Sequence, residues 1–521
     1  MYIRLATSVK NKFIGLILLF YDSGSKNVTE NLIKTSEETL KEPGLADGLH
    51  KKSSRTQWKQ WLACISATLS MVSVGTVYGW VTTTISRLEN GKDVPVKTTS
   101  DQGSWISSLT VIGSMFGSFL GAWLSDRFGR KRCLLLSSIF YISGWTLTIF
   151  AWRVESLYFA RIILGVGVGI SYSTNPMYVS EVADVKIRGA LGTLIAVNVF
   201  TGSLLMVSIG PWVSYQVLGT VALLIPLIFV IVFLCFPESP YYLAANGFHE
   251  EAMNVLSFFK GIDDREEVRK ELDIILETIN QHSESSGNWK ERFQQLLMQI
   301  NNRKALLIVS GLLLTQQLSG NFSMMQYIQN LLEKTNNIGL EPHVSTIIII
   351  ASGLVAGTGA TLTVDSYGRR PLLMFSTIGC TITLGIFAIY LYIDSTHVDI
   401  SAVNLIPIID MVFFQIAFQL GLGTLPNALI GELFPGNVKG IAAASLTILD
   451  GILTFTVVKL YSPISEAYGE HVMFAFFAIS CFLAFFFVFA FIPETKKRTL
   501  NEIQEILSQK GLRCRRRSSC K

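Results

Sequence analysis

The sequence predicts an all-α integral membrane protein with twelve transmembrane helices in two six-helix bundles and a cytoplasmic helical insert. Half of the 521 residues are hydrophobic, only 16% are charged, and the mean hydropathy is +0.43. Apolar runs of about 18 residues or more recur, each long enough to cross a hydrocarbon layer about 30 Å thick. Because the backbone must satisfy its own hydrogen bonds in lipid, these runs are predicted to be helices.

Twelve apolar runs follow one another in chain order. They lie near residues 61–84, 104–125, 133–152, 157–180, 190–211, 215–236, 304–330, 344–364, 371–393, 403–430, 440–461 and 472–492. A polar stretch separates the sixth run from the seventh. Its segments "DREEVRKELDIILETINQ" and "WKERFQQLLMQI" have the apolar spacing and charge pairs of amphipathic helices, so we expect a small helical domain rather than a flexible linker.

The expected domains follow from these runs. They are a cytoplasmic N-terminal tail at 1–60, an N-terminal bundle at 61–240, a cytoplasmic linker domain at 241–303, a C-terminal bundle at 304–492 and a basic cytoplasmic tail at 493–521.

Cations predict the orientation in the membrane. They gather in the turns after the second and eighth runs, at Arg127, Arg130, Lys131, Arg132, Arg369 and Arg370. Because Lys and Arg are enriched in cytoplasmic loops, both termini are expected in the cytoplasm, and the plasma membrane is the expected location. The net charge of +5 reflects this asymmetry, so we expect the lipid bilayer and no nucleic acid as a partner.

Three charged features occur twice in the same order. "LSDRFGRKRC" begins at Leu124 and "VDSYGRRPLL" at Val364. Each half then places an acid seven residues before a cation, at Glu181 and Arg188 and at Glu432 and Lys439. Each half ends in a Pro-Glu pair, at Pro237 and at Pro493. The repetition predicts that the two bundles are parallel repeats of one another.

Repeated charges at helix ends are expected to form a latch between two bundles that rock about a central site. The predicted cytoplasmic gate comprises Asp126, Arg130, Arg161, Glu181, Arg188, Asp365, Arg369, Glu432 and Lys439. Partly dehydrated pairs of this kind would favour one state by about 1–3 kcal/mol in total. The alternative is that these charges only anchor the helix ends and set the topology.

The ordered motifs resemble the sugar-porter family of the major facilitator superfamily. They are "DRFGRK" at 126–131, "RIILG" at 161–165, "EVADVKIRG" at 181–189, "PESP" at 237–240, "QQLSG" at 316–320, "DSYGRR" at 365–370, "GELFP" at 431–435 and "PET" at 493–495. The "GW" at 79–80 and "SWISSL" at 104–109 resemble the insect facilitated trehalose transporter branch. The resemblance implies alternating access to a sugar bound at mid-membrane.

The expected substrate-binding residues combine this resemblance with depth in the membrane. Gln316 and Gln317 lie about 12 residues into the seventh run, roughly 18 Å deep at 1.5 Å per residue, where two amides need polar partners. Satisfied hydrogen bonds between helices are the alternative reading. The expected set comprises Gln316, Gln317, Asn321, Tyr327, Gln419, Asn427 and Asp450.

Several of these positions depart from the family pattern. This chain differs from the usual family residue at six places. The family residue is given first and this chain's second: Gln and Ala196, Asn and Phe322, Glu and Gln419, Trp and Asn427, Arg and Lys439, and Asn-Trp and Asp450-Gly451. The motifs of the moving parts are therefore kept, whereas the pocket is rebuilt. Hexoses, disaccharides such as trehalose, and polyols all remain open as substrates.

Asp450 lies about 16 Å into the eleventh run, where an ionised carboxylate costs about 2.5–3.5 kcal/mol. It is expected either to line the cavity or to be a buried, hydrogen-bonded structural residue. The first run, "WLACISATLSMVSVGTVYGWVTTT", contains no acid, whereas proton-coupled relatives generally place an Asp there. This favours facilitated diffusion; proton-coupled symport and a non-transporting sugar sensor are the alternatives.

Enzyme chemistry finds no support in the sequence. No nucleophile–base set, metal-ligand cluster or phosphate-binding loop stands out, so we expect no catalytic residues, no metal and no cofactor. The expected partners are a small sugar or polyol and the bilayer, and the expected oligomeric state is a monomer.

Overall fold

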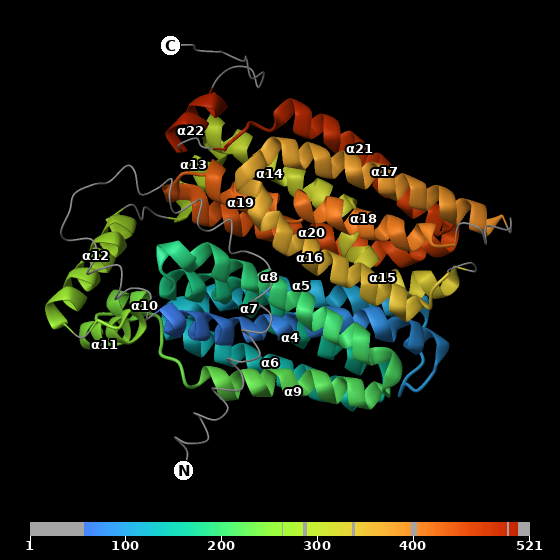
Figure 1. Cartoon of the computed structure of the whole chain (residues 1–521), viewed down its shortest axis with the longest axis horizontal. Coiled ribbons are helices and arrows are strands. Elements are labelled where there is room, and N and C mark those ends of the chain that lie inside the picture. Colours follow the sequence, from blue (N-terminus) through green and yellow to red (C-terminus); the bar gives the residue numbers. More distant parts are fainter. Residues whose placement is uncertain are drawn as a thin grey trace, which may run out of the picture. The chain divides into compact units, whose positions relative to one another are not determined.

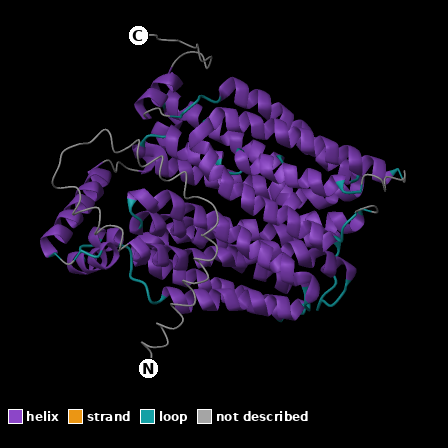
Figure 2. Ribbon diagram, viewed as in Figure 1, coloured by secondary structure: helices purple, strands orange, loops and turns teal. Residues whose placement is uncertain are grey.

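The structure, a computed structural model of the chain, describes residues 57–262, 264–284, 289–335, 339–396, 404–496 and 500–508. All regular structure in these residues is helical, as Figure 2 shows. Twelve of the described helical segments are long and apolar enough to cross a membrane, which confirms the predicted number and order of spans. Most of the predicted N-terminal tail and the end of the basic tail lie outside the described residues.

The first six spans form the N-terminal half. They are α4 (Gln57–Asn90), α5 (Ser100–Phe128), α6 (Arg130–Ile149), α7 (Val154–Val182), α8 (Val185–Ile209) and α9 (Tyr215–Phe233). A short 3-10 turn, η1 (Gly210–Trp212), continues α8. Within this half α7 packs against both α5 and α6, and α9 packs against α6.

Glycines bring α5 and α7 close together. A Cβ atom added to Gly165 would lie 2.9 Å from the Cα atom of Gly113, closer than real side chains approach. The two backbones therefore touch, as small residues permit in membrane helices.

The last six spans form the C-terminal half. They are built from α14 (Ile300–Leu318) with α15 (Asn321–Lys334), α16 (Pro342–Tyr367), α17 (Arg369–Ser395), α18 (Ile406–Leu420) with α19 (Leu425–Leu433), α20 (Gly436–Tyr468) and α21 (Glu470–Phe491). The seventh and tenth spans are thus broken helices, whereas the sequence predicts continuous ones. Broken helices at mid-membrane are typical of transporter binding sites.

Two helix pairs make the most extensive contacts between the halves. The helix α5 packs against α20, and α8 packs against α16. Figure 1 shows the helices of the two halves as two adjacent groups that run in the same general direction. Many large apolar side chains on the outside are exposed, including Ile231 on α9 and Leu483 on α21, as expected of surfaces that face lipid.

The polar insert divides between the two halves. Its helices α10 (Pro240–Ala245), α11 (His249–Lys260) and α12 (Arg265–Glu284) share a small core and lie against the N-terminal half, where Phe259 is buried beside Phe233. The helix α13 (Trp289–Met298) instead packs against α14 and α20. A C-terminal helix, α22 (Leu500–Ser508), also packs on α14. We call the end of the spans that carries α10–α12 the linker end, and the other end the far end.

Candidate functional site

The break in the seventh span sets the position of the predicted glutamines. Gln316 and Gln317 occupy the last turn of α14, and Gly320 then takes a left-handed conformation with φ of 72° before α15 begins at Asn321. A Cβ atom at Gly320 would meet the ring of Phe477, so only glycine fits both the backbone and the space. The break therefore presents the two amides near the middle of the span.

Gln317 and Asp450 bond to each other. The Gln317 Nε2 atom donates to the Asp450 Oδ1 atom at 2.8 Å, which joins the seventh span to the eleventh. Both side chains are half-buried. The next residue, Gly451, lies against Met115 of α5, so this pair sits beside the contact between the two halves. Asp450 is therefore hydrogen-bonded, as one of the two expectations requires, and cavity lining stays a prediction.

Gln415, which sequence reasoning missed, bonds to Asn321 on the other side of the Gly320 break; we call this pair and the Gln317–Asp450 pair together the polar cluster. The Gln415 Nε2 atom lies 3.0 Å from Asn321 Oδ1 and 2.9 Å from Met325 Sδ. Its Oε1 atom is buried and accepts no hydrogen bond from the described residues. The signal in the sequence was a second glutamine, four residues before Gln419, inside the apolar stretch "FFQIAFQL".

The structure places the remaining predicted residues at different levels. Gln419 is almost fully buried on α18, whereas Asn427 is exposed on α19. Tyr327 lies six residues beyond Asn321, about 9 Å farther toward the far end. It is buried and stacks on Tyr461, with ring centroids 5.0 Å apart. Gln317 with Asp450 and Asn321 with Gln415 therefore lie near the helix break, and Tyr327 lies farther toward the far end. That these residues bind substrate stays a prediction.

Aromatic and backbone contacts close the site toward the far end. The ring of Phe322 meets Tyr78 of α4 edge to face at 5.3 Å. The Thr82 hydroxyl donates to the Met325 carbonyl at 2.9 Å. Both contacts join the first span to the seventh, and thus one half to the other.

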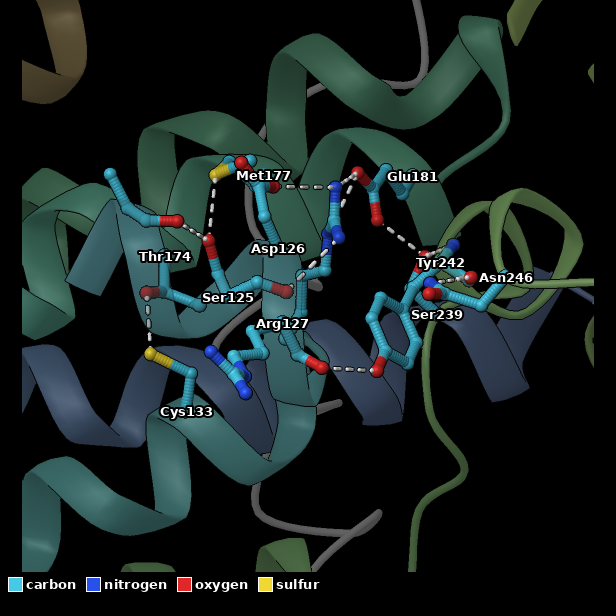
Figure 3. A network of polar contacts seen from close by, with 12 residues as sticks. Ser125, Asp126, Arg127, Cys133, Thr174, Met177, Glu181, Ser239, Tyr242 and Asn246 are labelled. Carbon is cyan, nitrogen blue, oxygen red and sulfur yellow. Dashed lines mark hydrogen bonds and ion pairs between the residues drawn. The ribbon is translucent and has the colours of Figure 1, made fainter. Parts of the chain in front are cut away.

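At the linker end, charged residues of the N-terminal half bond to one another. The Arg130 Nη2 atom lies 2.9 Å from Glu181 Oε1 and 3.7 Å from Asp126 Oδ1. Glu181 also accepts a hydrogen bond from Ser239. Figure 3 shows this network, with Glu181 pointing toward Ser239 and the Tyr242 hydroxyl pointing toward the carbonyl of Arg127.

The C-terminal half repeats this arrangement. The Arg369 Nη2 atom lies 2.9 Å from Glu432 Oε1, and the Thr495 hydroxyl donates to Glu432 Oε2 at 2.5 Å. The Pro-Glu motifs match as well. Glu238 accepts from the backbone N–H of Lys131 at 2.8 Å, and Glu494 accepts from that of Arg369 at 3.1 Å. Each glutamate thus satisfies free N–H groups at the start of the third span of its half.

Three predicted gate residues need correction. Arg161 precedes Glu181 by 20 residues on α7, about 30 Å along the helix, so it lies toward the far end and not in the gate. It is 1% exposed and donates to the carbonyls of Ile106 and Val77, each at 3.1 Å. Arg188 and Lys439 do lie at the linker end, but they donate to the carbonyls of Ala183 and Gly431 and not to the glutamates seven residues before them.

The repeated ion pairs form within each half. Among the side chains that the structure describes, Arg130 pairs with Glu181 and Asp126 of its own half, and Arg369 pairs with Glu432 of its own half. Asp365 lies near the end of α16, but its side chain is outside the described part. A latch that joins the halves at this end is therefore absent from the described contacts of this conformation.

Contacts at the far end join the two halves. The Lys459 Nζ atom of α20 lies 2.6 Å from Asp101 Oδ1 of α5 and 4.5 Å from the centre of the Trp105 ring. The hydroxyls of Ser100 and Ser462 lie 2.5 Å apart. Ser86 donates to Glu333, and Asn330 Nδ2 donates to Glu89 Oε2 at 3.1 Å.

Comparison with known proteins agrees with this architecture. The chain is 29% identical over 447 residues to the facilitated trehalose transporter Tret1 of Polypedilum vanderplanki, covering 86% of this chain and 88% of that one. It is 28% identical over 493 residues to Tret1 of Bombyx mori, covering 94% and 95% of the two chains.

Solved structures show the same fold. A structure of the major facilitator superfamily proton:xylose symporter XylE matches with a TM-score of 0.69 and 21% identity, over 87% of this chain and all of that one. XylE from E. coli in a partially occluded inward open conformation matches with a TM-score of 0.70 and 21% identity, over 84% and 99%. These likenesses confirm the predicted major facilitator fold.

A family model described as "Sugar (and other) transporter" matches residues 13–507, nearly the whole chain. With its twelve spans, broken seventh and tenth helices and repeated charged networks, the chain is a multi-pass membrane protein that belongs to the sugar (and other) transporter family.

Proposed function

We propose that this protein carries a small polyhydroxylated solute, trehalose or a hexose, across the plasma membrane by facilitated diffusion with alternating access. The observation that carries the proposal is the Gln317–Asp450 hydrogen bond between the seventh and eleventh spans. Amide and carboxylate groups at this depth can exchange their mutual bond for bonds to sugar hydroxyls. Asn321 and Gln415 add further amides to the same cluster.

The orientation follows from the position of the cations. Arg127, Arg130, Lys131 and Arg132 lie between α5 and α6, and Arg369 and Arg370 lie at the start of α17, all at the linker end. This favours a cytoplasmic linker end and cytoplasmic termini. The far end then faces outside, and the contacts between halves at that end are those of an inward-facing state.

Proton coupling is the second candidate, and Asp450 is the observation that favours it. A carboxylate whose described partner is an uncharged amide can exchange a proton during the cycle. Against this, α4 contains no acidic residue deeper than Glu89 near its far end. Facilitated diffusion is therefore the simpler reading of the described residues.

Both parts of the proposal can be tested in proteoliposomes loaded with buffer and exposed to labelled trehalose or glucose. Uptake to equilibrium without a pH gradient would support facilitated diffusion. Accumulation that collapses with a protonophore would replace it with symport. Gln317→Ala is expected to lose most uptake, whereas Gln216→Ala, an exposed glutamine near the start of α9, is the matched control and is expected to keep it. Unchanged uptake by Gln317→Ala would contradict the position of the site.

We further propose that one chain is the functional unit and that its two six-span halves are the moving domains. The two halves and the polar cluster beside their contact belong to one chain. The helices α10–α12 attach to one half and α13 to the other.

A further inference from the structure

A hollow of about 640 Å³ opens at the far end, between the last turns of α4 and α15, the turn after α8 and the start of α16. We call it the far-end vestibule and define it by Arg87, Asp93, Trp212, Gln329, Glu333 and His343. Both halves contribute to it. None of these residues belongs to the polar cluster around Gln317.

The lining of the vestibule has the chemistry of a carbohydrate site. Trp212 is 74% exposed, and its ring meets His343 of the other half at 5.4 Å. An aromatic face packs against the C–H face of a sugar ring, while nearby carboxylates such as Asp93 and Glu333 accept hydrogen bonds from its hydroxyls. A tryptophan that only anchored the protein at the membrane interface would not need to line a polar hollow with charged residues.

One buried polar atom in the vestibule lacks a partner. Gln329 is 6% exposed, and its Nε2 atom donates to Glu333 Oε1 at 3.0 Å. Its Oε1 atom accepts no hydrogen bond from any described residue. An unpaired buried acceptor costs free energy, and a ligand hydroxyl would supply the missing donor once the far end opens and exposes this atom.

The turn that carries Trp212 is held in place from both sides. Arg87 donates to the carbonyls of Gly210 and Val213, the latter at 2.9 Å. Asp93 Oδ2 accepts from the backbone N–H of Tyr215 at 3.0 Å. The ring is therefore positioned by the fold before any ligand arrives.

The vestibule lies directly on the contacts that close the far end. Ser86 and Glu333 line it, and the hydrogen bond between them joins the halves. A solute held on Trp212 and Gln329 would therefore be next to the contact that must break when this end opens.

We propose that the far-end vestibule is a second carbohydrate site, which loads the transport site from the far side of the membrane. This inference rests on the proposed function, because it assumes that the transported solute is a sugar. It assigns Trp212 as the stacking platform and Gln329 as a hydroxyl acceptor.

The test compares trehalose influx and efflux in cells that express Trp212→Ala or Gln329→Leu at equal surface amounts. A site reached only from the far end should raise the influx KM about fivefold at an unchanged maximal influx rate. Because a passive carrier keeps the ratio of maximal rate to KM equal in the two directions, this ratio should fall about fivefold for efflux as well, through a lower maximal efflux rate and not through a higher efflux KM. Trp212→Phe keeps an aromatic face and is expected to restore most of the influx KM. Trp152→Ala removes another tryptophan that is 70% exposed but does not line the vestibule, so it should have no effect.

An unchanged influx KM in both variants would overturn the inference, and so would an equal rise of the influx KM and the efflux KM at unchanged maximal rates. A failure of the proposed function is distinguishable from these results. If the unaltered protein carries neither trehalose nor glucose in either direction, the proposed function fails and the vestibule site falls with it. If flux is normal and symmetric in the variants, only the vestibule site fails.

Discussion

The two ends of the spans hold their polar contacts in different ways. At the linker end, Arg130 with Glu181 and Arg369 with Glu432 bond inside their own halves. At the far end, Lys459 with Asp101 joins one half to the other. The first kind of contact stabilises each bundle as a unit, whereas the second selects a conformation of the whole molecule. Polar contacts at helix ends therefore cannot all be read as gates.

The largest expected effect comes from locking the far end. Ser100 and Ser462 lie on opposite halves with their hydroxyls 2.5 Å apart, so the double variant Ser100→Cys/Ser462→Cys places two thiols within reach of a disulfide. Oxidation is expected to stop nearly all trehalose uptake, and a reductant to restore it. Uptake would be measured before and after each treatment.

The single variants provide the control for this cross-link. Ser100→Cys alone and Ser462→Cys alone should keep their uptake under the same oxidant, because the five described cysteines form no disulfide and four of them are buried. Full activity of the cross-linked double variant would mean that the far end does not have to open.

The next effect concerns the stability of one half. Arg130→Ala leaves Glu181 without its cation at a site where both side chains are mostly buried, at 13% and 14% exposure. Removing one partner of such a pair is expected to cost about 3 kcal/mol of folding stability. Thermal unfolding of the purified protein should therefore begin several degrees lower, and Arg369→Ala should act in the same way through Glu432.

These variants also sharpen the comparison between the ends. In this conformation the pairs lie within single halves. Removing them should therefore change the balance between inward-facing and outward-facing states only a little. Normal thermal stability combined with a large shift in that balance would show that these charges are a latch between halves after all.

A smaller effect is expected from the ion pair at the far end. Asp101 is 67% exposed, so its pair with Lys459 should contribute about 0.5–1 kcal/mol, a factor of about two to five in the ratio of states. Lys459→Ala should therefore speed the modification of a Thr82→Cys reporter by an impermeant maleimide added from outside. Thr82 is 3% exposed beneath these contacts.

Two controls separate charge from packing in this experiment. Lys459→Arg keeps a cation over Trp105 and should leave the modification rate close to its original value. The double exchange Lys459→Asp/Asp101→Lys restores an ion pair with its charges reversed, so it should bring the modification rate part of the way back. If the Thr82→Cys reporter is modified equally fast with Lys459→Ala and with the original Lys459, the ion pair does not help to close the far end.

The smallest effect is expected at Arg188. This side chain is exposed and its described bond is to the nearby Ala183 carbonyl at 3.3 Å. Arg188→Ala should change the free energy of unfolding by less than about 0.5 kcal/mol and should leave the uptake rate nearly unchanged. A loss as large as that of Arg130→Ala would indicate that Arg188 pairs with an acid in another state of the cycle.

The sequence was sufficient to predict the spans and their repetition. Hydropathy requires only composition and length, and every predicted run lies within or close to a described helix. The breaks in the seventh and tenth spans were not predicted. They depend on local backbone conformation, such as the left-handed Gly320 packed against Phe477, which hydropathy does not register.

The site was predicted in part. Gln317 and Asp450 were chosen separately from their depth, and the structure places them 2.8 Å apart. Gln415 was missed because one glutamine in an apolar run gives no indication of which helix it faces. The spacing of Glu181 and Arg188 suggests a pair. However, α7 ends and α8 begins between them, so a spacing of seven residues does not fix the direction of one side chain relative to the other. Arg130, 51 residues away along the chain, is the described partner of Glu181.

The central claim is that two rigid halves rock, so that one end opens as the other closes. Distances between spin labels test it most directly, with one pair at exposed Lys92 and Tyr468 of the far end and another at exposed Arg132 and Tyr367 of the linker end. Adding trehalose to the protein in lipid nanodiscs should shift the two distance distributions in opposite directions. The distance within one pair should lengthen as the distance within the other shortens. If both pairs change in the same direction, or one changes alone, the halves do not rock as units and the account is wrong.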